Sequence, residues 1–306
     1  MDGIMMGILL FLALNISQAA DVVFVPKAQV DHQYRLPLVV MFHGCNTTAN
    51  EFAAGTHMND YAQAHGFAVF YPEQDLSRNV ERCWNWFLPV NQVHGPFGEA
   101  DFLMSRVRNV VANYGFDPTR VYVVGMSAGA GMAAILSSCF AYEIAGVAMH
   151  SGISYEAAFD TKSAKDTIEK GQTLSTELTA SHAYQCSYFP RKTMPMIAFH
   201  GTADVRVHPT NLNSVTSHLL RFNDFMKDGA LNGDVSLLPA RETFVRGNPY
   251  MKDYIVTDYD SNFTVLARTV QVANMQHAWS GGDSRFPRND MYAPSASHMI
   301  VDFFGL

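Results

Sequence analysis

Hydrophobic and polar positions repeat along the chain with two periods, one typical of buried strands and the other of amphipathic helices. Continuous apolar runs of strand length, which suit a sheet buried on both faces, occur at Leu36–Phe42, Phe67–Tyr71, Val121–Met126, Val147–His150 and Met194–His200. Apolar residues at helical spacing occur within Thr48–His65, Glu99–Tyr114, Ala128–Ser138, Leu212–Met226 and Ser297–Phe304. Strands that alternate with helices predict an α/β fold with a doubly wound, mostly parallel sheet flanked by helices.

Two further features complete the predicted organisation. Tyr254–Asp258 and Thr264–Val272 are expected to pair as a hairpin across Asp260-Ser261. Two polar stretches, Ile153–Lys192 and Lys227–Lys252, interrupt the alternation, and neither is rich enough in proline or serine to be a linker. We expect both to be insertions over the upper, active-site face of the sheet, with residues 20–306 forming a single catalytic domain.

Residues 1–19 have the pattern of a secretory signal peptide. Ile4–Leu14 is apolar but too short for a membrane span, and Ala19-Ala20 suits cleavage. Met1-Asp2-Gly3 lacks the usual lysine or arginine, so a buried N-terminal core segment is the alternative. No second stretch is long and apolar enough to cross a bilayer, and we therefore expect no stable membrane insertion.

The cysteine count indicates the cellular compartment, and the net charge limits the kinds of partner the protein can bind. The four cysteines, Cys45, Cys83, Cys139 and Cys186, fit an oxidised compartment and allow three pairings, with free buried thiols as the alternative. Together with the leader they predict an extracellular or periplasmic protein. A net charge of −7 argues against nucleic acid as a partner, because phosphate binding needs a positive field. No cysteine or histidine spacing indicates a metal site.

The chemistry is indicated most strongly by the segment Gly125-Met126-Ser127-Ala128-Gly129. It follows a β-branched run and leads into an alanine-rich helix, the context of a nucleophile elbow with Ser127 at its tip. Gly125 and Gly129 are expected to avoid collisions with the neighbouring strand and helix. An ordinary Gly-Ser-Gly turn is the alternative.

A serine nucleophile needs a base, and the base needs an orienting carboxylate. We predict Asp204 as the acid because it follows the strand Met194–His200, and His277 as the base because it follows the late strand ending near Val272. An Asx-turn residue is the alternative for Asp204. Among the other histidines, His208 could line the same crevice, whereas His298 is expected to cap or pack a helix.

An oxyanion hole requires two backbone amides aimed at the developing negative charge. One is expected from Ala128, directly after the nucleophile. The other is expected from Cys45, in the loop after Leu36–Phe42, where Gly44 permits a tight turn.

Five segments in this order resemble the polyhydroxybutyrate depolymerase-type esterases, a family that overlaps with feruloyl and acetylxylan esterases. They are His43-Gly44-Cys45, Cys83-Trp84-Asn85-Trp86-Phe87, Gly125-Met126-Ser127-Ala128-Gly129-Ala130, His200-Gly201-Thr202-Ala203-Asp204 and His277-Ala278-Trp279. The resemblance implies an α/β-hydrolase fold, ester hydrolysis without metal or organic cofactor, and a Ser127–His277–Asp204 triad. It also implies that Cys45 pairs with Cys83 and Cys139 with Cys186.

The aromatic segments suggest where substrate binds, with Trp84, Asn85 and Trp279 as the predicted contacts. Aromatic faces suit polyester chains, feruloyl rings and sugars alike. The leading hypothesis is a secreted serine esterase acting on poly(3-hydroxybutyrate)-like polyester or its oligomers. The alternatives are a feruloyl or acetylxylan esterase, acyl transfer to an alcohol by the same site, and a non-catalytic matrix-binding protein of the same fold.

Overall fold

The computed structural model describes residues 20–27, 35–189, 192–261 and 264–306. The strands are β1 (Val22–Phe24), β2 (Leu38–Phe42), β3 (Ala68–Tyr71), β4 (Val121–Met126), β5 (Gly146–His150), β6 (Met196–Gly201), β7 (Arg241–Val245), β8 (Tyr254–Ser261), β9 (Thr264–Val272), β10 (Trp279–Ser280) and β11 (Asn289–Asp290). The helices are α1 (Ala49–Gly55), α2 (Met58–His65), the short 3₁₀ helix η2 (Pro89–Asn91), α3 (Glu99–Tyr114), α4 (Ala128–Cys139), α5 (Thr161–Lys170), α6 (Thr176–Cys186), α7 (Asn211–Asp228) and α8 (Ala296–Phe304).

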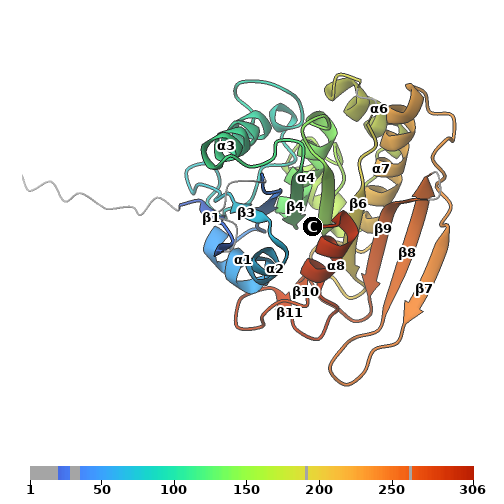
Figure 1. Cartoon of the computed structure of the whole chain (residues 1–306). Coiled ribbons are helices and arrows are strands. Elements are labelled where there is room, and N and C mark those ends of the chain that lie inside the picture. Colours follow the sequence, from blue (N-terminus) through green and yellow to red (C-terminus); the bar gives the residue numbers. More distant parts are fainter. Residues whose placement is uncertain (1–19, 28–34, 190–191, 262–263) are drawn as a thin grey trace, which may run out of the picture.

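A nine-stranded sheet runs through the middle of the described chain, in the order β1-β3-β2-β4-β5-β6-β9-β8-β7 (Figure 1). The six strands from β3 to β9 in this order are parallel, whereas β1 and β8 are antiparallel to their neighbours. Helical connections join the parallel strands, and the predicted doubly wound sheet is therefore confirmed.

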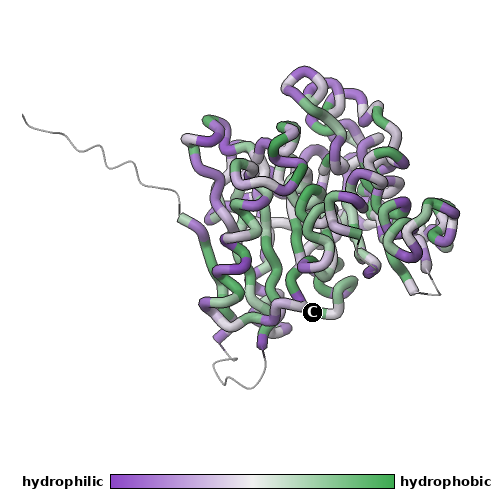
Figure 2. The backbone as a smooth tube through the Cα atoms, turned by 90° about the horizontal axis from the view of Figure 1, so that it is seen from above, coloured by the Kyte–Doolittle hydropathy of each residue, from purple (hydrophilic) through white to green (hydrophobic). Residues whose placement is uncertain are grey.

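The two faces of the sheet bury alternate residues of each central strand. In β2, Leu38, Val40 and Phe42 pack in a cluster with residues of α3, α4, α6 and α7. Val39 and Met41 pack in a second cluster with residues of α1, α2 and α8. Figure 2 shows the same distribution, with hydrophobic residues along the inner strands and hydrophilic residues in the outer loops. Burial on both faces explains why these strands read as continuous apolar runs.

Three expectations about local structure need correction or fall outside the described residues. The helix expected over Thr48–His65 is two helices, because His57 has a left-handed backbone (φ 57°) between α1 and α2. The hairpin of β8 and β9 is present, but Asp260 and Ser261 belong to β8 and do not form its turn. The predicted signal peptide, residues 1–19, lies outside the described residues.

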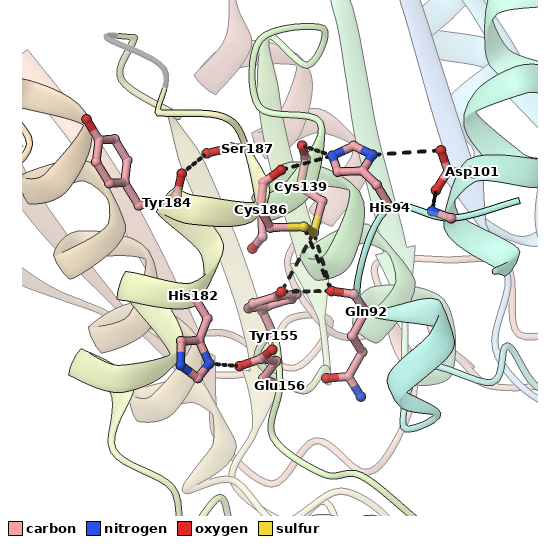
Figure 3. The surroundings of a disulfide bond; sticks show 12 residues. Gln92, His94, Asp101, Cys139, Tyr155, Glu156, His182, Tyr184, Cys186 and Ser187 are labelled. Atoms are coloured by element: carbon pink, nitrogen blue, oxygen red, sulfur yellow. Dashed lines mark hydrogen bonds and ion pairs between the residues drawn. A yellow bond between two sulfur atoms is a disulfide. The ribbon is translucent and has the colours of Figure 1, made fainter.

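The two polar stretches lie in different parts of the fold. Ile153–Lys192 contributes α5 and α6, and the Cys139–Cys186 disulfide joins the end of α4 to the end of α6 (Figure 3). His94 Nε2 lies 3.1 Å from the Cys139 carbonyl oxygen and 2.9 Å from that of Cys186, beside this bond. Lys227–Lys252 is not an insertion over the upper face, because β7 within it pairs with β8 at the edge of the sheet.

A ladder of charges crosses the three strands at this edge. Arg241, Asp258 and Arg268 are direct register partners on β7, β8 and β9. The buried Asp258 carboxylate accepts from Arg241 Nη2 at 2.5 Å and from Arg268 Nε at 2.6 Å. Burial alone would raise the pKa of Asp258, but these hydrogen bonds and charges outweigh burial and lower it.

Three buried histidines make the stability of the fold dependent on pH. Burial lowers the pKa of His43, and lowers that of His150 and His218 to about 3. His150 and His218 are therefore neutral in the folded protein near pH 5, whereas the same residues in an unfolded chain bind protons below about pH 6.5. Proton binding to the unfolded state destabilises the fold as the pH falls.

We expect the free energy of unfolding to fall between pH 6.5 and 4.5, by up to about 1.4 kcal/mol per pH unit for each such histidine. Denaturant titrations at several pH values would measure this slope. The variant His218→Gln should have a shallower slope than the wild type. A free energy of unfolding that is constant over this range would contradict the prediction.

The Cys139–Cys186 disulfide should contribute strongly to stability, because it links residues separated by 47 positions. The chain-entropy model gives about 4 kcal/mol for a loop of this length. We expect the double variant Cys139→Ser, Cys186→Ser to lose stability of this order in denaturant titrations. An unchanged unfolding midpoint would show that the crosslink does not constrain the unfolded chain.

Candidate active site

Ser127 lies at a sharp turn between β4 and α4 with a positive φ (φ 58°, ψ −124°). Such a conformation is rare for a residue with a side chain and is typical of a nucleophile elbow. A Cβ atom on Gly125 would lie 2.2 Å from the Gly129 carbonyl oxygen, and one on Gly129 would lie 2.2 Å from that of Phe42. Both glycines are therefore required for the close approach of α4 to β4 and β2.

The predicted acid and base come from loops that follow the carboxyl ends of β6 and β9. His277 Nδ1 lies 2.8 Å from Asp204 Oδ2, and both side chains are buried. The other carboxylate oxygen, Oδ1, accepts hydrogen bonds of 2.9 Å from the backbone amides of Arg206 and Val207. Burial favours a raised pKa for Asp204, but the hydrogen bonds from His200 and His277 outweigh it and hold the pKa well below its usual value. Asp204 is therefore ionised.

Ser127 and His277 are not joined by a hydrogen bond in the structure. Because His277 Nδ1 faces Asp204, Nε2 is the ring nitrogen that remains for a partner on the other side. His150 links the turn at Ser127 to the segment after His277. Its carbonyl oxygen accepts from Ser127 N at 2.9 Å, and its ring Nε2 accepts from Ser280 N at 3.0 Å. The elbow and the segment after His277 are thus fastened to the same residue of β5.

The predicted oxyanion amides lie beside the elbow. A Cβ atom on Gly44 would lie 3.4 Å from Ser127 Cβ, so the loop before Cys45 packs directly on the serine. Within the described residues, neither the Cys45 amide nor the Ala128 amide donates a hydrogen bond. Trp84 Nε1 holds this loop by donating to the His43 carbonyl oxygen at 2.9 Å. Two amides without an internal acceptor are suited to a negatively charged oxygen.

A pocket of about 410 Å³ opens beside Ser127. One wall is aromatic and sulfur-rich, with Trp84, Trp86, Phe87 and the Cys45–Cys83 disulfide. Helix α5 contributes Ala164, Lys165, Ile168 and Glu169 to the lining, and the segment after Asp204 adds Val205, Arg206 and Val207. The stretch Ile153–Lys192 therefore covers the face on which Ser127 lies, as the sequence predicted.

Residues 20–235 match the family described as esterase PHB depolymerase. The chain belongs to this family.

Relatives in the family include poly(3-hydroxyalkanoate) depolymerase C of Paucimonas lemoignei, 30% identical over 225 residues, which cover 72% of this chain and 53% of that protein. Acetylxylan esterase A of Emericella nidulans is 31% identical over 57% of this chain and 58% of its own length. Feruloyl esterase B of Neurospora crassa is 28% identical over 56% of this chain and 60% of its own length. The matches thus span between half and two thirds of these relatives.

Structural comparison agrees on the fold. The acetyl xylan esterase from Aspergillus awamori superposes with a TM-score of 0.70, covering 93% of each chain at 17% identity. The α/β-hydrolase fold implied by the sequence resemblance is confirmed. The two disulfides, Cys45–Cys83 and Cys139–Cys186, are those that the resemblance implied.

The three predicted substrate contacts occupy different environments. Trp84 is part of the pocket lining, although it is only 1% exposed. Asn85 lies beside it but is not part of its lining, because its backbone amide and side-chain amide both donate to Glu99. Trp279 is as buried as Trp84 but does not line the pocket, and it is therefore wrong as a contact: its side chain packs edge-on against Phe52 and donates to Ser297. The sequence placed an aromatic residue near His277 but gave no sign that it points inward.

One other serine and three other histidines can be considered for the site, and none of them lines the pocket. Ser138 and His218 form a hydrogen bond of 3.4 Å, but both are buried, and His218 has no carboxylate partner in the described chain. His208 is exposed, bonds to Thr210 and does not line the pocket, whereas His298 stacks on Tyr61, as expected of a packing residue.

The described residues contain no group of three potential metal ligands and no helix long and apolar enough to cross a membrane.

Sequence reasoning missed three residues near the site. The buried Glu99 carboxylate accepts from Gln74 Nε2 at 2.6 Å and from the Asn85 amide at 2.8 Å, which organises the segment before the pocket wall. Arg206 lines the pocket, and Arg288 donates to the Cys45 carbonyl oxygen. Glu99 could have been suspected from its place in the first turn of an amphipathic helix, but nothing in the sequence marks Arg288.

The close approach at Gly129 gives a direct test of the elbow. We expect Gly129→Ala to destabilise the protein by at least about 2 kcal/mol, because the new methyl group overlaps the backbone of Phe42. Gly95→Ala is the matched control, since a Cβ there meets nothing within 4 Å, and it should change stability by less than about 0.5 kcal/mol. Denaturant titration of both variants measures the difference, and equal effects would refute the packing argument.

Proposed function

We propose that this chain is a serine carboxylic-ester hydrolase that acts on poly(3-hydroxybutyrate)-like polyester or its oligomers. The observation that carries the proposal is the strained Ser127, which opens into a pocket beside two backbone amides that lack an internal acceptor. The buried His277–Asp204 hydrogen bond supplies the arrangement that a general base requires. Membership of the family supports the same reaction class.

The proposed reaction has two stages. Ser127 Oγ attacks the ester carbonyl carbon while His277 Nε2 takes the hydroxyl proton, and Asp204 stabilises the imidazolium that forms. The Cys45 and Ala128 amides bind the oxyanion of the tetrahedral intermediate. The C–O bond to the alcohol then breaks, and His277 returns the proton to the leaving alkoxide. Water, deprotonated by His277, attacks the acyl-serine, releases the carboxylic acid and regenerates Ser127.

Two substrate classes are consistent with the pocket. The aromatic wall of Trp84, Trp86 and Phe87 suits an aliphatic polyester chain, and one relative is named as a poly(3-hydroxyalkanoate) depolymerase. Feruloyl or acetylxylan esters are the second candidate, because other relatives carry those names. The two disulfides support action in an oxidising compartment, either outside the cell or in the periplasm.

The variant Ser127→Ala tests the nucleophile. We expect it to retain the circular dichroism spectrum and unfolding midpoint of the wild type while its ester hydrolysis falls by at least about a thousandfold. Initial rates on hydroxybutyrate oligomers, methyl ferulate and acetylated xylan rank the substrate classes. Retention of a tenth of wild-type turnover would refute the assignment of Ser127, and a clear preference for ferulate would favour the second candidate.

The variant Asp204→Asn tests the orienting role of the carboxylate. An asparagine of the same shape removes the charge and favours the wrong tautomer of His277, so we expect kcat to fall by about three to four orders of magnitude. KM for the same ester should change much less, because Asp204 is buried behind the ring and does not line the pocket. An unchanged kcat would exclude Asp204 as the partner of the base.

A further inference from the structure

Two arginines without carboxylate partners lie beside Ser127. Arg206 is exposed and lines the same pocket as the serine. Arg288 is half-buried, and its Nη1 lies 3.6 Å from the position that a Cβ on Gly44 would occupy, a point 3.4 Å from Ser127 Cβ. In the part of the chain that the structure describes, neither guanidinium forms an ion pair.

The surroundings of these arginines make the missing partner significant. The neighbouring carboxylates are already engaged: Asp204 with His277, Glu169 with Lys165, Asp283 with Arg285 and Asp290 with Lys252. Partial burial of a cation without a counter-ion is unfavourable. Burial, followed by the charge of Arg206, lowers the pKa of Arg288. A local excess of positive charge thus lies beside the nucleophile of a chain whose net charge is −7.

Backbone contacts fix both arginines to the site. The amide of Arg206 donates to Asp204 Oδ1, so the loop that carries the acid also brings Arg206 to the pocket. Arg288 donates to the Cys45 carbonyl oxygen, and its own carbonyl oxygen accepts from Trp279 N at 2.7 Å. The Arg288 side chain therefore bridges the segment after His277 and the proposed oxyanion loop. The Arg206 contact is made by its backbone amide, and the Arg288 contact uses only Nη1, whereas a guanidinium has five N–H groups.

We propose that Arg206 and Arg288 form a subsite for a carboxylate, and that the preferred substrates are short hydroxyacid oligoesters with a free carboxylate a few bonds from the scissile ester. This inference rests on the proposed function at Ser127. In a 3-hydroxybutyrate dimer the free carboxyl carbon is roughly 5 Å from the ester carbon, a reach that suits cations placed next to Ser127. A guanidinium binds such a carboxylate through paired, charge-assisted hydrogen bonds.

The test compares the 3-hydroxybutyrate dimer as free acid with its methyl ester, which lacks the negative charge but carries a second ester bond, so cleavage of the internal ester is measured for both. We expect the wild type to have a kcat/KM at least about tenfold higher for the free acid, and the ratio to fall as sodium chloride is raised. Arg206→Gln and Arg288→Gln should each bring the ratio towards one. Arg288→Lys retains the charge and should preserve more of the preference than Arg288→Gln.

Arg285→Gln is the matched control, because Arg285 is exposed, lies in the same segment and pairs with Asp283. It should leave the ratio unchanged. A wild-type ratio near one, or a ratio that neither arginine substitution alters, would overturn the subsite. Equal losses on both substrates would overturn it too, since they would show that the arginines only position the oxyanion loop.

The same assays separate this inference from the proposed function. If the wild type hydrolyses the methyl ester and p-nitrophenyl butyrate, and Ser127→Ala does not, the proposed function stands whatever the ratio. If the wild type hydrolyses none of the three esters, the proposed function fails and the subsite fails with it. Calorimetric titration of Ser127→Ala with the free-acid dimer gives a readout without turnover, and we expect measurable binding that Arg206→Gln weakens.

Discussion

The positive φ at Ser127 is the constraint around which the site is organised. A serine in this conformation is strained, and the surrounding structure must hold it. Gly125 and Gly129 allow the start of α4 to contact the ends of β4 and β2. The same close approach brings the loop at Gly44 against the serine. Ser127 and the two amides proposed for the oxyanion hole are thus brought together by one packing contact.

The buried, neutral His150 holds the turn at Ser127 through a hydrogen bond. His150 stacks between Phe199 and Trp279, accepts from the amide of Ser280 through its ring and from the amide of Ser127 through its backbone. Its low pKa keeps the ring nitrogen available as an acceptor. Trp279, expected to contact substrate, instead forms part of this support. Trp279 thus packs behind the segment that carries His277 and does not line the pocket.

The parts of the fold that could be predicted are those in which one physical signal dominates. The structure has β4 at Val121–Met126 and α3 at Glu99–Tyr114, as predicted, because continuous burial and clear helical spacing mark them. The proximity of Asp204 and His277 was predictable, because the carboxyl ends of parallel strands lie at the same edge of a sheet and both residues follow such an end. Their catalytic roles, and that of Ser127, stay predictions.

The failures have equally specific causes. Strand β7 was missed because all five of its residues are partly or fully exposed, so it carries no apolar run. The break at His57 was missed although Gly55, the last residue of α1, precedes it, because the helical spacing of apolar residues continues across Thr48–His65. The surroundings of Arg288 and Trp279 could not be predicted, because they depend on the direction of each side chain within an irregular segment, and no sequence periodicity encodes that direction. The disulfide pairing also needed more than spacing, since four cysteines allow three connectivities.

The Arg241–Asp258–Arg268 ladder determines how the exposed strand can add to the sheet. Adjacent residues of a strand point to opposite faces, so a slip of β7 by one position would turn Arg241 away from Asp258. The acid would then keep Arg268 as its single cation inside a buried environment. A polar edge strand, which hydrophobicity alone would leave free to slide, therefore has one electrostatically preferred alignment.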